Sequence, residues 1–85
     1  MYQIIVPNNC QKFLLKLGDY DYKKIKDKIV LLENTPRPRG CLQLSDSDQY
    51  RIRCGNYRIV YEIDDDSKVV YIYKINHRKE IYKKK

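Results

Sequence analysis

The sequence feature that most constrains the fold is a pair of β-prone segments, residues 50–54 and 57–63, joined only by Gly55-Asn56. Two such loop residues predict a tight antiparallel hairpin in which Arg53 faces Arg58. Because side chains alternate along a strand, one face of this hairpin is apolar and needs a layer of helices to cover it. The expected pairs are Cys54 with Tyr57, Ile52 with Ile59, Arg51 with Val60 and Tyr50 with Tyr61. The apolar face consists of Tyr50, Ile52, Cys54, Tyr57, Ile59, Tyr61 and Ile63.

The opposite face of the hairpin carries Arg51, Arg53 and Arg58. Like charges that lie directly opposite each other disfavour strand pairing unless an anion or a carboxylate lies between them. A formal net charge of +7 also favours a polyanionic partner. The arginines therefore indicate a site for a negatively charged ligand. The alternative is a solvated basic face with Glu62 as a partial counterion.

The N-terminal half predicts the helical layer. A strand is expected over residues 2–6, followed by a helix over residues 9–17 that Asn8 or Asn9 caps and Gly18 ends. The apolar residues of this helix recur at i, i+3, i+4 and i+7, as on one face of a helix. They are Cys10, Phe13, Leu14 and Leu17.

A second helix follows after a short link, so the two helices are expected to form an antiparallel hairpin. Asp19 or Asp21 is its expected cap, and residues 34–36 end it. Its lysines fall mainly outside the apolar face. Residues 35–49 contain two prolines and a glycine and are expected to form a loop, and residues 69–76 form a last strand after an acidic turn. The apolar positions of the second helix are Tyr22, Ile25, Ile29 and Leu32.

These elements predict a single α+β domain over residues 1–85. It consists of an N-terminal strand, an antiparallel helical hairpin packed on a mainly antiparallel four-stranded sheet (β-α-α-β-β-β), and a short C-terminal segment. Three cysteines are an odd number without a C-x-x-C pair, and His77 is the only histidine, so neither a disulfide framework nor a metal site is expected. No secretory signal or membrane-spanning run is recognisable, and a cytoplasmic protein with reduced thiols is expected.

The basic tail adds three candidate site residues. His77 and Arg78 follow the last predicted strand, and Tyr82 lies one short turn further. These side chains can reach the same sheet face as the arginines. The alternative is structural, because a lone surface histidine is usually incidental and a terminal tyrosine usually packs on the core. The consecutive aspartates 64–66 are interpreted as a polar turn rather than a cation site.

Two segments resemble the RelE branch of the RelE/ParE toxin superfamily: residues 50–63, YRIRCGNYRIVYEI, and residues 77–82, HRKEIY. The order of elements is similar too, and the resemblance extends over nearly the whole chain. It implies the toxin of a type II toxin–antitoxin pair, which binds a 70S-type ribosome and cleaves messenger RNA in the A site. It also implies a cognate antitoxin, a monomeric free toxin, a hetero-oligomer with the antitoxin, and no membrane partner.

The reaction that the resemblance implies needs neither a metal nor another cofactor. The 2′-hydroxyl attacks the adjacent phosphate and leaves a 2′,3′-cyclic phosphate and a free 5′-hydroxyl. Arg58 and Arg53 match positions that stabilise the transition-state charge, Arg78 matches the group that protonates the leaving oxygen, and Tyr82 matches a tyrosine that orients or stacks on the substrate base. The basic residues expected to contact RNA are Arg37, Arg39, Arg51, Arg53, Lys74 and Lys79.

The identity of the general base stays open. Arg51 and Arg53 stand where the best-known member of the family has lysines, and arginine does not lose its proton in protein sites. Histidine titrates near neutrality, so His77 is the candidate base. Charge stabilisation without an efficient base is the alternative.

Two other functions are weighed against the ribonuclease. A ParE-type toxin shares the fold but inhibits DNA gyrase without ribonuclease activity. A non-catalytic RNA-binding module is the second alternative. The set formed by Arg51, Arg53, Arg58, Arg78 and Tyr82 favours the ribonuclease branch.

Overall fold

A computed structural model of the chain describes residues 1–45 and 47–77. No helix in these two ranges is long and apolar enough to cross a membrane. In chain order, the elements are β1 (Gln3–Ile5), α1 (Asn8–Leu15), α2 (Asp19–Leu31), β2 (Leu42–Gln43), β3 (Gln49–Cys54), β4 (Tyr57–Asp64) and β5 (Val69–His77).

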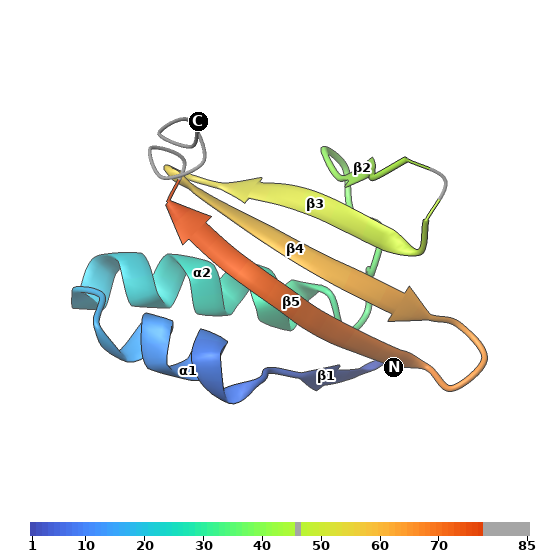
Figure 1. Cartoon of the computed structure of the whole chain (residues 1–85), viewed down its shortest axis with the longest axis horizontal. Helices are drawn as coiled ribbons and strands as arrows, with labels where there is room; N and C mark the ends of the chain where they lie inside the picture. Colours follow the sequence, from blue (N-terminus) through green and yellow to red (C-terminus); the bar gives the residue numbers. More distant parts are fainter. Residues whose placement is uncertain (46, 78–85) are drawn as a thin grey trace.

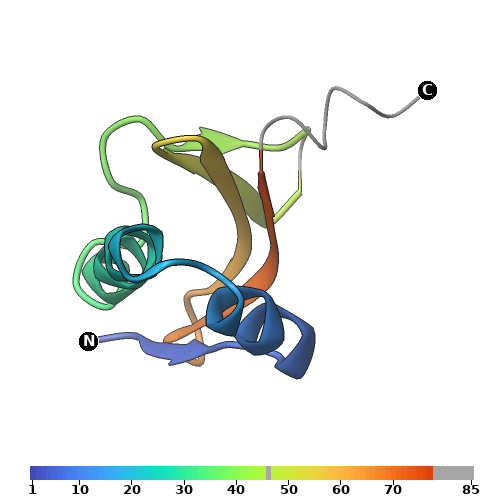
Figure 2. The ribbon, with the colours of Figure 1, turned by 90° about the vertical axis from the view of Figure 1, so that its left-hand side faces the viewer.

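The strands form one sheet in the order β1-β5-β4-β3-β2 (Figure 1). β1 is parallel to β5, and all other neighbouring pairs are antiparallel. Figure 2 shows that α1 and α2 lie on one side of this curved sheet. The predicted α+β class, with a helical hairpin on a mainly antiparallel sheet, is therefore confirmed.

The sheet has five strands in the described part of the chain, one more than the sequence predicts. The additional strand, β2, lies within residues 35–49, which were expected to form a loop. Its two residues, Leu42 and Gln43, pair with Arg51 and Tyr50 at the edge of β3. Both β2 side chains are exposed, so no alternation of apolar and polar residues marks this strand in the sequence.

The β3–β4 hairpin has the predicted register, with Arg53 opposite Arg58 and Cys54 opposite Tyr57. Gly55 occupies the first loop position with φ +60°, a conformation that L side chains rarely adopt. The predicted apolar face lies against the helices. Its five buried members are Ile52, Cys54, Ile59, Tyr61 and Ile63, while Tyr50 and Tyr57 pack against the core from its margin.

Both helices begin at backbone caps instead of the predicted asparagine and aspartate side chains. Pro7 is the N-cap of α1, and its carbonyl accepts hydrogen bonds from the first turn. Gly18 is the N-cap of α2, where it accepts a hydrogen bond of 2.9 Å from the Tyr22 N–H, and it does not end α1. The predicted caps are wrong because Asn8 and Asp19 are already the first helical residues, and the N-cap positions before them are occupied by Pro7 and Gly18, which have no side-chain acceptor. α1 ends at Leu15, two residues earlier than expected.

A β-bulge interrupts the alternation of side chains along β5. Val60 of β4 pairs with Lys74, whereas Tyr61 pairs with Ile72, which leaves Tyr73 as the extra residue. A bulge of this kind reverses which face the following side chains occupy. The inward side of β5 therefore changes from even-numbered to odd-numbered residues.

Candidate functional site

The sheet face away from the helices, here called the open face, carries the three predicted arginines. Arg53 lies directly opposite Arg58, which in turn lies opposite Asn76 of β5. In the next row from the turn, Arg51 lies across β4 from Lys74. Three neighbouring strands thus bring four cations and an amide to one end of the open face.

The two rows of paired strand residues that carry these cations contain no carboxylate. Neither Arg51 nor Arg53 forms an ion pair or a side-chain hydrogen bond with another residue of the ranges 1–45 and 47–77. Glu62 shares the open face but lies in a row further from the turn, opposite Gln49 and Tyr71. The end of the sheet near the hairpin turn therefore concentrates positive charge, which favours binding of an anion.

Arg58 is the central member of the cluster. It comes from the interior strand β4, with β3 on one side and β5 on the other. The residue is half-buried, and its Nε atom is closed off from solvent. The guanidinium group of an arginine carries N–H donors that match the oxygens of a phosphate.

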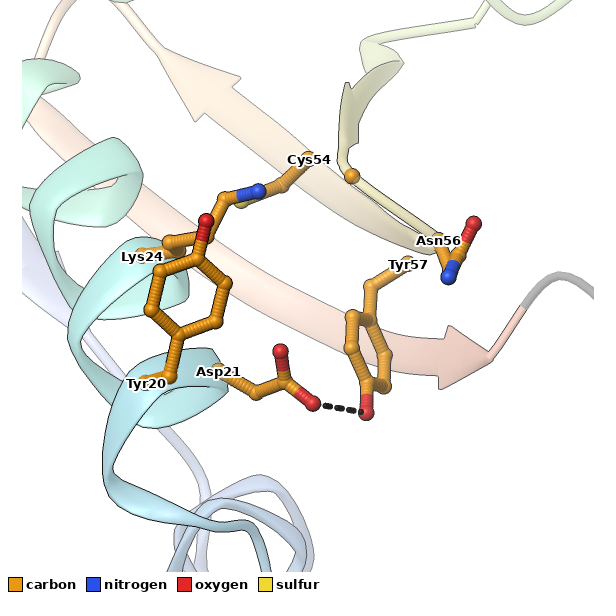
Figure 3. Close-up of a pocket in the computed structure, with 7 residues that line it drawn as sticks. Tyr20, Asp21, Lys24, Cys54, Asn56 and Tyr57 are labelled. Atoms are coloured by element: carbon orange, nitrogen blue, oxygen red, sulfur yellow. Dashed lines mark hydrogen bonds between the residues drawn. The ribbon is translucent and has the colours of Figure 1, made fainter.

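His77 lies on the helix side of the sheet and is not brought together with the arginines. It pairs with Tyr57, and the two rings meet edge to face with centroids 5.1 Å apart. The Tyr57 ring also contacts Phe13 of α1, and its hydroxyl donates a hydrogen bond of 3.0 Å to Asp21 Oδ2 of α2 (Figure 3). His77 thus belongs to an aromatic contact between the end of β5 and the helices.

The bulge in β5 explains where the candidate residues of that strand lie. Strict alternation with the buried Ile72 would turn Lys74 and Asn76 towards the helices. After the bulge, Ile75 is the buried residue instead, and Lys74 and Asn76 join the open face. The predicted RNA contact at Lys74 therefore lies beside the arginine cluster.

Two residues of this face were missed by reasoning from the sequence. Asn76 shares a row with Arg58, and Tyr73 is 55% exposed with its ring centroid 5.9 Å from Lys74 Nζ. An exposed aromatic ring beside cations is a common platform for stacking a nucleic-acid base. The bulge in β5 places both residues on the open face. Its only signal in the sequence is the three-residue spacing between Ile72 and Ile75, where strict alternation would give an even spacing.

Of the two predicted arginines of the 35–49 segment, Arg37 has its partners outside the cluster. Arg37 forms an ion pair with Asp65 at 2.9 Å, and its Nε donates a hydrogen bond to the Tyr50 hydroxyl at 3.0 Å. Tyr2 also donates a hydrogen bond to Asp65, at 2.6 Å. The hydrogen bonds from Arg37 and then Tyr2 lower the pKa of Asp65, so this group ties β1, the loop and the β4–β5 turn together. Arg39 is exposed.

The remaining predicted site residues, Arg78, Lys79 and Tyr82, lie outside the described residues. The cluster in the described part of the chain can bind a phosphate and stabilise additional charge on its oxygens. Arginine is a poor proton acceptor, so the cluster favours positioning and charge stabilisation over proton removal.

Comparison with known proteins identifies the family to which the chain belongs. Residues 4–82 match the family described as the ParE toxin of the type II toxin–antitoxin system parDE. A protein of Methanocaldococcus jannaschii provisionally named toxin RelE1 is 34% identical over 76 residues, which cover 85% of this chain and 84% of that protein. The chain therefore belongs to the RelE/ParE superfamily of type II toxins.

Solved structures of RelE proteins are similar over most of their length. The archaeal RelE–RelB complex from Pyrococcus horikoshii OT3 matches with a TM-score of 0.80 and 29% identity, covering 91% of this chain and 94% of that one. The isolated E. coli RelE toxin matches with a TM-score of 0.79 and 27% identity, covering 96% and 92%. Within the superfamily, the chain is thus a RelE-type toxin of a type II toxin–antitoxin system.

Proposed function

We propose that this toxin is a ribosome-dependent endoribonuclease that cleaves messenger RNA in the A site by metal-independent attack of the 2′-hydroxyl, and so inhibits translation. The observation that carries the proposal is the opposition of Arg53 and Arg58 on the open face, flanked by Arg51 and Lys74. Two opposed guanidinium groups disfavour strand pairing by their like charge, and together they suit a phosphate that gains charge during the reaction.

In this mechanism, the scissile phosphate binds between Arg53 and Arg58. Attack by the 2′-oxygen forms a bond to phosphorus, and the bond to the 5′-oxygen breaks, which leaves a cyclic phosphate and a 5′-hydroxyl. The guanidinium groups stabilise the extra negative charge on the non-bridging oxygens. By the family resemblance, Arg78 acts on the leaving 5′-oxygen, to which it donates a hydrogen bond while water supplies the proton, and Tyr82 orients or stacks on the substrate base.

Efficient removal of the 2′-hydroxyl proton requires a general base. Arg51 belongs to the cluster but is a poor base. His77 remains the candidate base by residue type, although in the free protein its ring packs on Tyr57 at the opposite face of the sheet. An H77A variant that cleaves at the wild-type rate at every pH would exclude His77 and favour catalysis by charge stabilisation alone.

The partners follow from the same proposal. The toxin acts on messenger RNA bound to a 70S-type ribosome, and a cognate antitoxin inhibits it in a hetero-oligomer. Relatives solved as RelE–RelB complexes, from P. horikoshii and from Mycobacterium tuberculosis among others, support the antitoxin. The basic open face would attract an acidic segment of such a partner.

The second candidate function is inhibition of DNA gyrase, because the matched family bears the name of the ParE toxins. The two functions predict different products. A gyrase inhibitor would leave ribosome-bound message intact and block DNA supercoiling. The arginine cluster favours the ribonuclease.

The experiment that tests the proposal is single-turnover cleavage of a message on programmed ribosomes by wild-type protein and the Arg58→Ala variant. Loss of one group that stabilises developing charge costs about 100- to 1000-fold in rate. We expect that loss at saturating toxin, with ribosome binding retained. Lys26→Ala is the control, because Lys26 is an exposed cation of α2. Equal loss of binding and cleavage in the Arg58 variant would assign Arg58 to RNA binding instead of charge stabilisation, and a wild-type protein that binds the message without cleaving it would favour a non-catalytic RNA-binding module.

A further inference from the structure

A second basic site adjoins the arginine cluster at the hairpin end of β3, on the side of the sheet that faces α2. It is a hollow of about 410 Å³ between α2 and the end of β3 at the hairpin turn. Three of its lining side chains are cations, and one of these, Arg53, also belongs to the open face. The lining residues are Lys24, Asp27, Lys28, Leu31, Arg53, Cys54 and Gly55.

The lysines of the hollow are held close to the hairpin turn. Lys24 extends from α2 towards the turn (Figure 3), and its Nζ lies 3.1 Å from the point that a Cβ on Gly55 would occupy. The same ammonium group lies 5.2 Å from the centroid of the Tyr20 ring, a cation–π contact. Burial raises the pKa of the Cys54 thiol, and the positive charges of Lys28 and Lys24 oppose that rise, which is consistent with both lysines facing the hollow.

Carboxylates in the described part of the chain offset the positive charge of the hollow only in part, since Asp27 lines it and Asp21 also acts on Cys54. Lys24, Lys28 and Arg53 form no ion pair with any residue of the ranges 1–45 and 47–77. Asp27 is the only carboxylate of the lining, and it already pairs with Lys23 at 3.1 Å. Three cations thus surround an open space large enough for a phosphate group.

We propose that this hollow binds a backbone phosphate of the message strand, next to the nucleotides held on the open face. Arg53 lines both sites. An RNA strand that leaves the arginine cluster at the hairpin end can therefore continue over the turn to Lys24 and Lys28. The exposed Leu31 adds an apolar surface for a ribose or base at the far side. The identity of the RNA strand as message rests on the proposed function, whereas the phosphate site rests on the cations that line the hollow.

The test uses a Lys24→Gln/Lys28→Gln variant and a Lys12→Gln/Lys16→Gln control. Both variants lose two positive charges, and the control residues are exposed lysines of α1 and its C-cap that do not line the hollow. Matching thermal melts verify that both variants fold. Binding is measured against salt concentration with a fluorescent single-stranded RNA that carries 2′-O-methyl groups and cannot be cleaved, with vacant ribosomes, and with ribosomes programmed by a blocked message.

We expect the variant in the hollow to bind the RNA about fivefold more weakly than the control. The slope of log K against log salt should fall by about 1 relative to the control, because fewer counterions are released. The same loss is expected on programmed ribosomes and not on vacant ones.

Three results would distinguish a wrong phosphate site, a wrong assignment of that site to the message, and a wrong proposed function. An RNA affinity and salt slope equal to those of the control would overturn the phosphate site. A loss on vacant ribosomes without a loss on free RNA would overturn the assignment to the message and indicate ribosomal RNA. A wild-type protein that binds RNA through the hollow but cleaves no message would support the hollow and refute the proposed function.

Discussion

The direct opposition of Arg53 and Arg58 predicts that the proposed site weakens the folded state. Like charges opposite each other in an antiparallel pair destabilise it by up to about 1 kcal/mol. The two residues are partners in the β3–β4 ladder, and Arg53 has no counterion within residues 1–45 and 47–77. Arg53→Gln removes the repulsion and keeps a polar side chain at an exposed position. We therefore expect this substitution to stabilise the protein while it impairs cleavage.

The magnitude follows from the size of the domain. A gain of about 0.5 kcal/mol is the midpoint of the range for such pairs. For a domain of this size, each kcal/mol shifts the melting temperature by about 4–8 °C, so the expected rise is about 2–4 °C. The Debye length falls from about 10 Å at 0.1 M salt to about 3 Å at 1 M, so high salt should remove most of the difference.

The assay is thermal unfolding at low and high salt, with Lys26→Gln as a control for the general loss of one positive charge. Inorganic phosphate should raise the melting temperature of the wild type more than that of the Arg53 variant, because a ligand stabilises only the state that binds it. The reasoning is refuted if Arg53→Gln is no more stable than Lys26→Gln at low salt. It is also refuted if the difference between the two variants persists at 1 M salt.

Three further predictions concern the contacts around the site. Tyr57→Phe should lower the free energy of unfolding by about 1 kcal/mol, because it removes a part-buried hydrogen bond to the carboxylate of Asp21. Urea titration measures this change. The control Tyr20→Phe, at an exposed tyrosine, should leave the free energy of unfolding nearly unchanged. Asp65 has a folded-state pKa below its ordinary value of 3.8, so the wild type should be more stable than Asp65→Asn above about pH 4, and the difference should vanish as pH falls through the lowered pKa. Cys54 should react with a maleimide more slowly than Cys41, because burial raises the pKa of the Cys54 thiol.

The hairpin at the centre of the sheet was predictable from the sequence because local rules determine it. Gly55 meets the conformational demand of a two-residue loop, and period-two alternation then assigns every side chain from Tyr50 to Ile63 to a face. The arginine cluster follows from that register. The sequence alone therefore predicts that Arg53 lies opposite Arg58, as it does in the structure.

The remaining features depend on backbone geometry that side-chain patterns do not encode. β2 is held by backbone pairing to an edge strand, and its two exposed residues carry no periodic signal. The bulge at Tyr73 reverses the faces of β5, which brings Lys74 and Asn76 to the arginines and turns His77 towards Tyr57. Without the bulge, alternation from the buried Ile72 would place His77 on the open face, as the sequence suggested.

Ribonuclease activity is measured by incubating the purified toxin with a defined message, with and without programmed ribosomes, and mapping the ends of the products. We predict cuts within the A-site codon that require the ribosome and that leave a 2′,3′-cyclic phosphate and a 5′-hydroxyl. An intact message together with inhibition of gyrase supercoiling would exclude the ribonuclease and assign the protein to the ParE-type function.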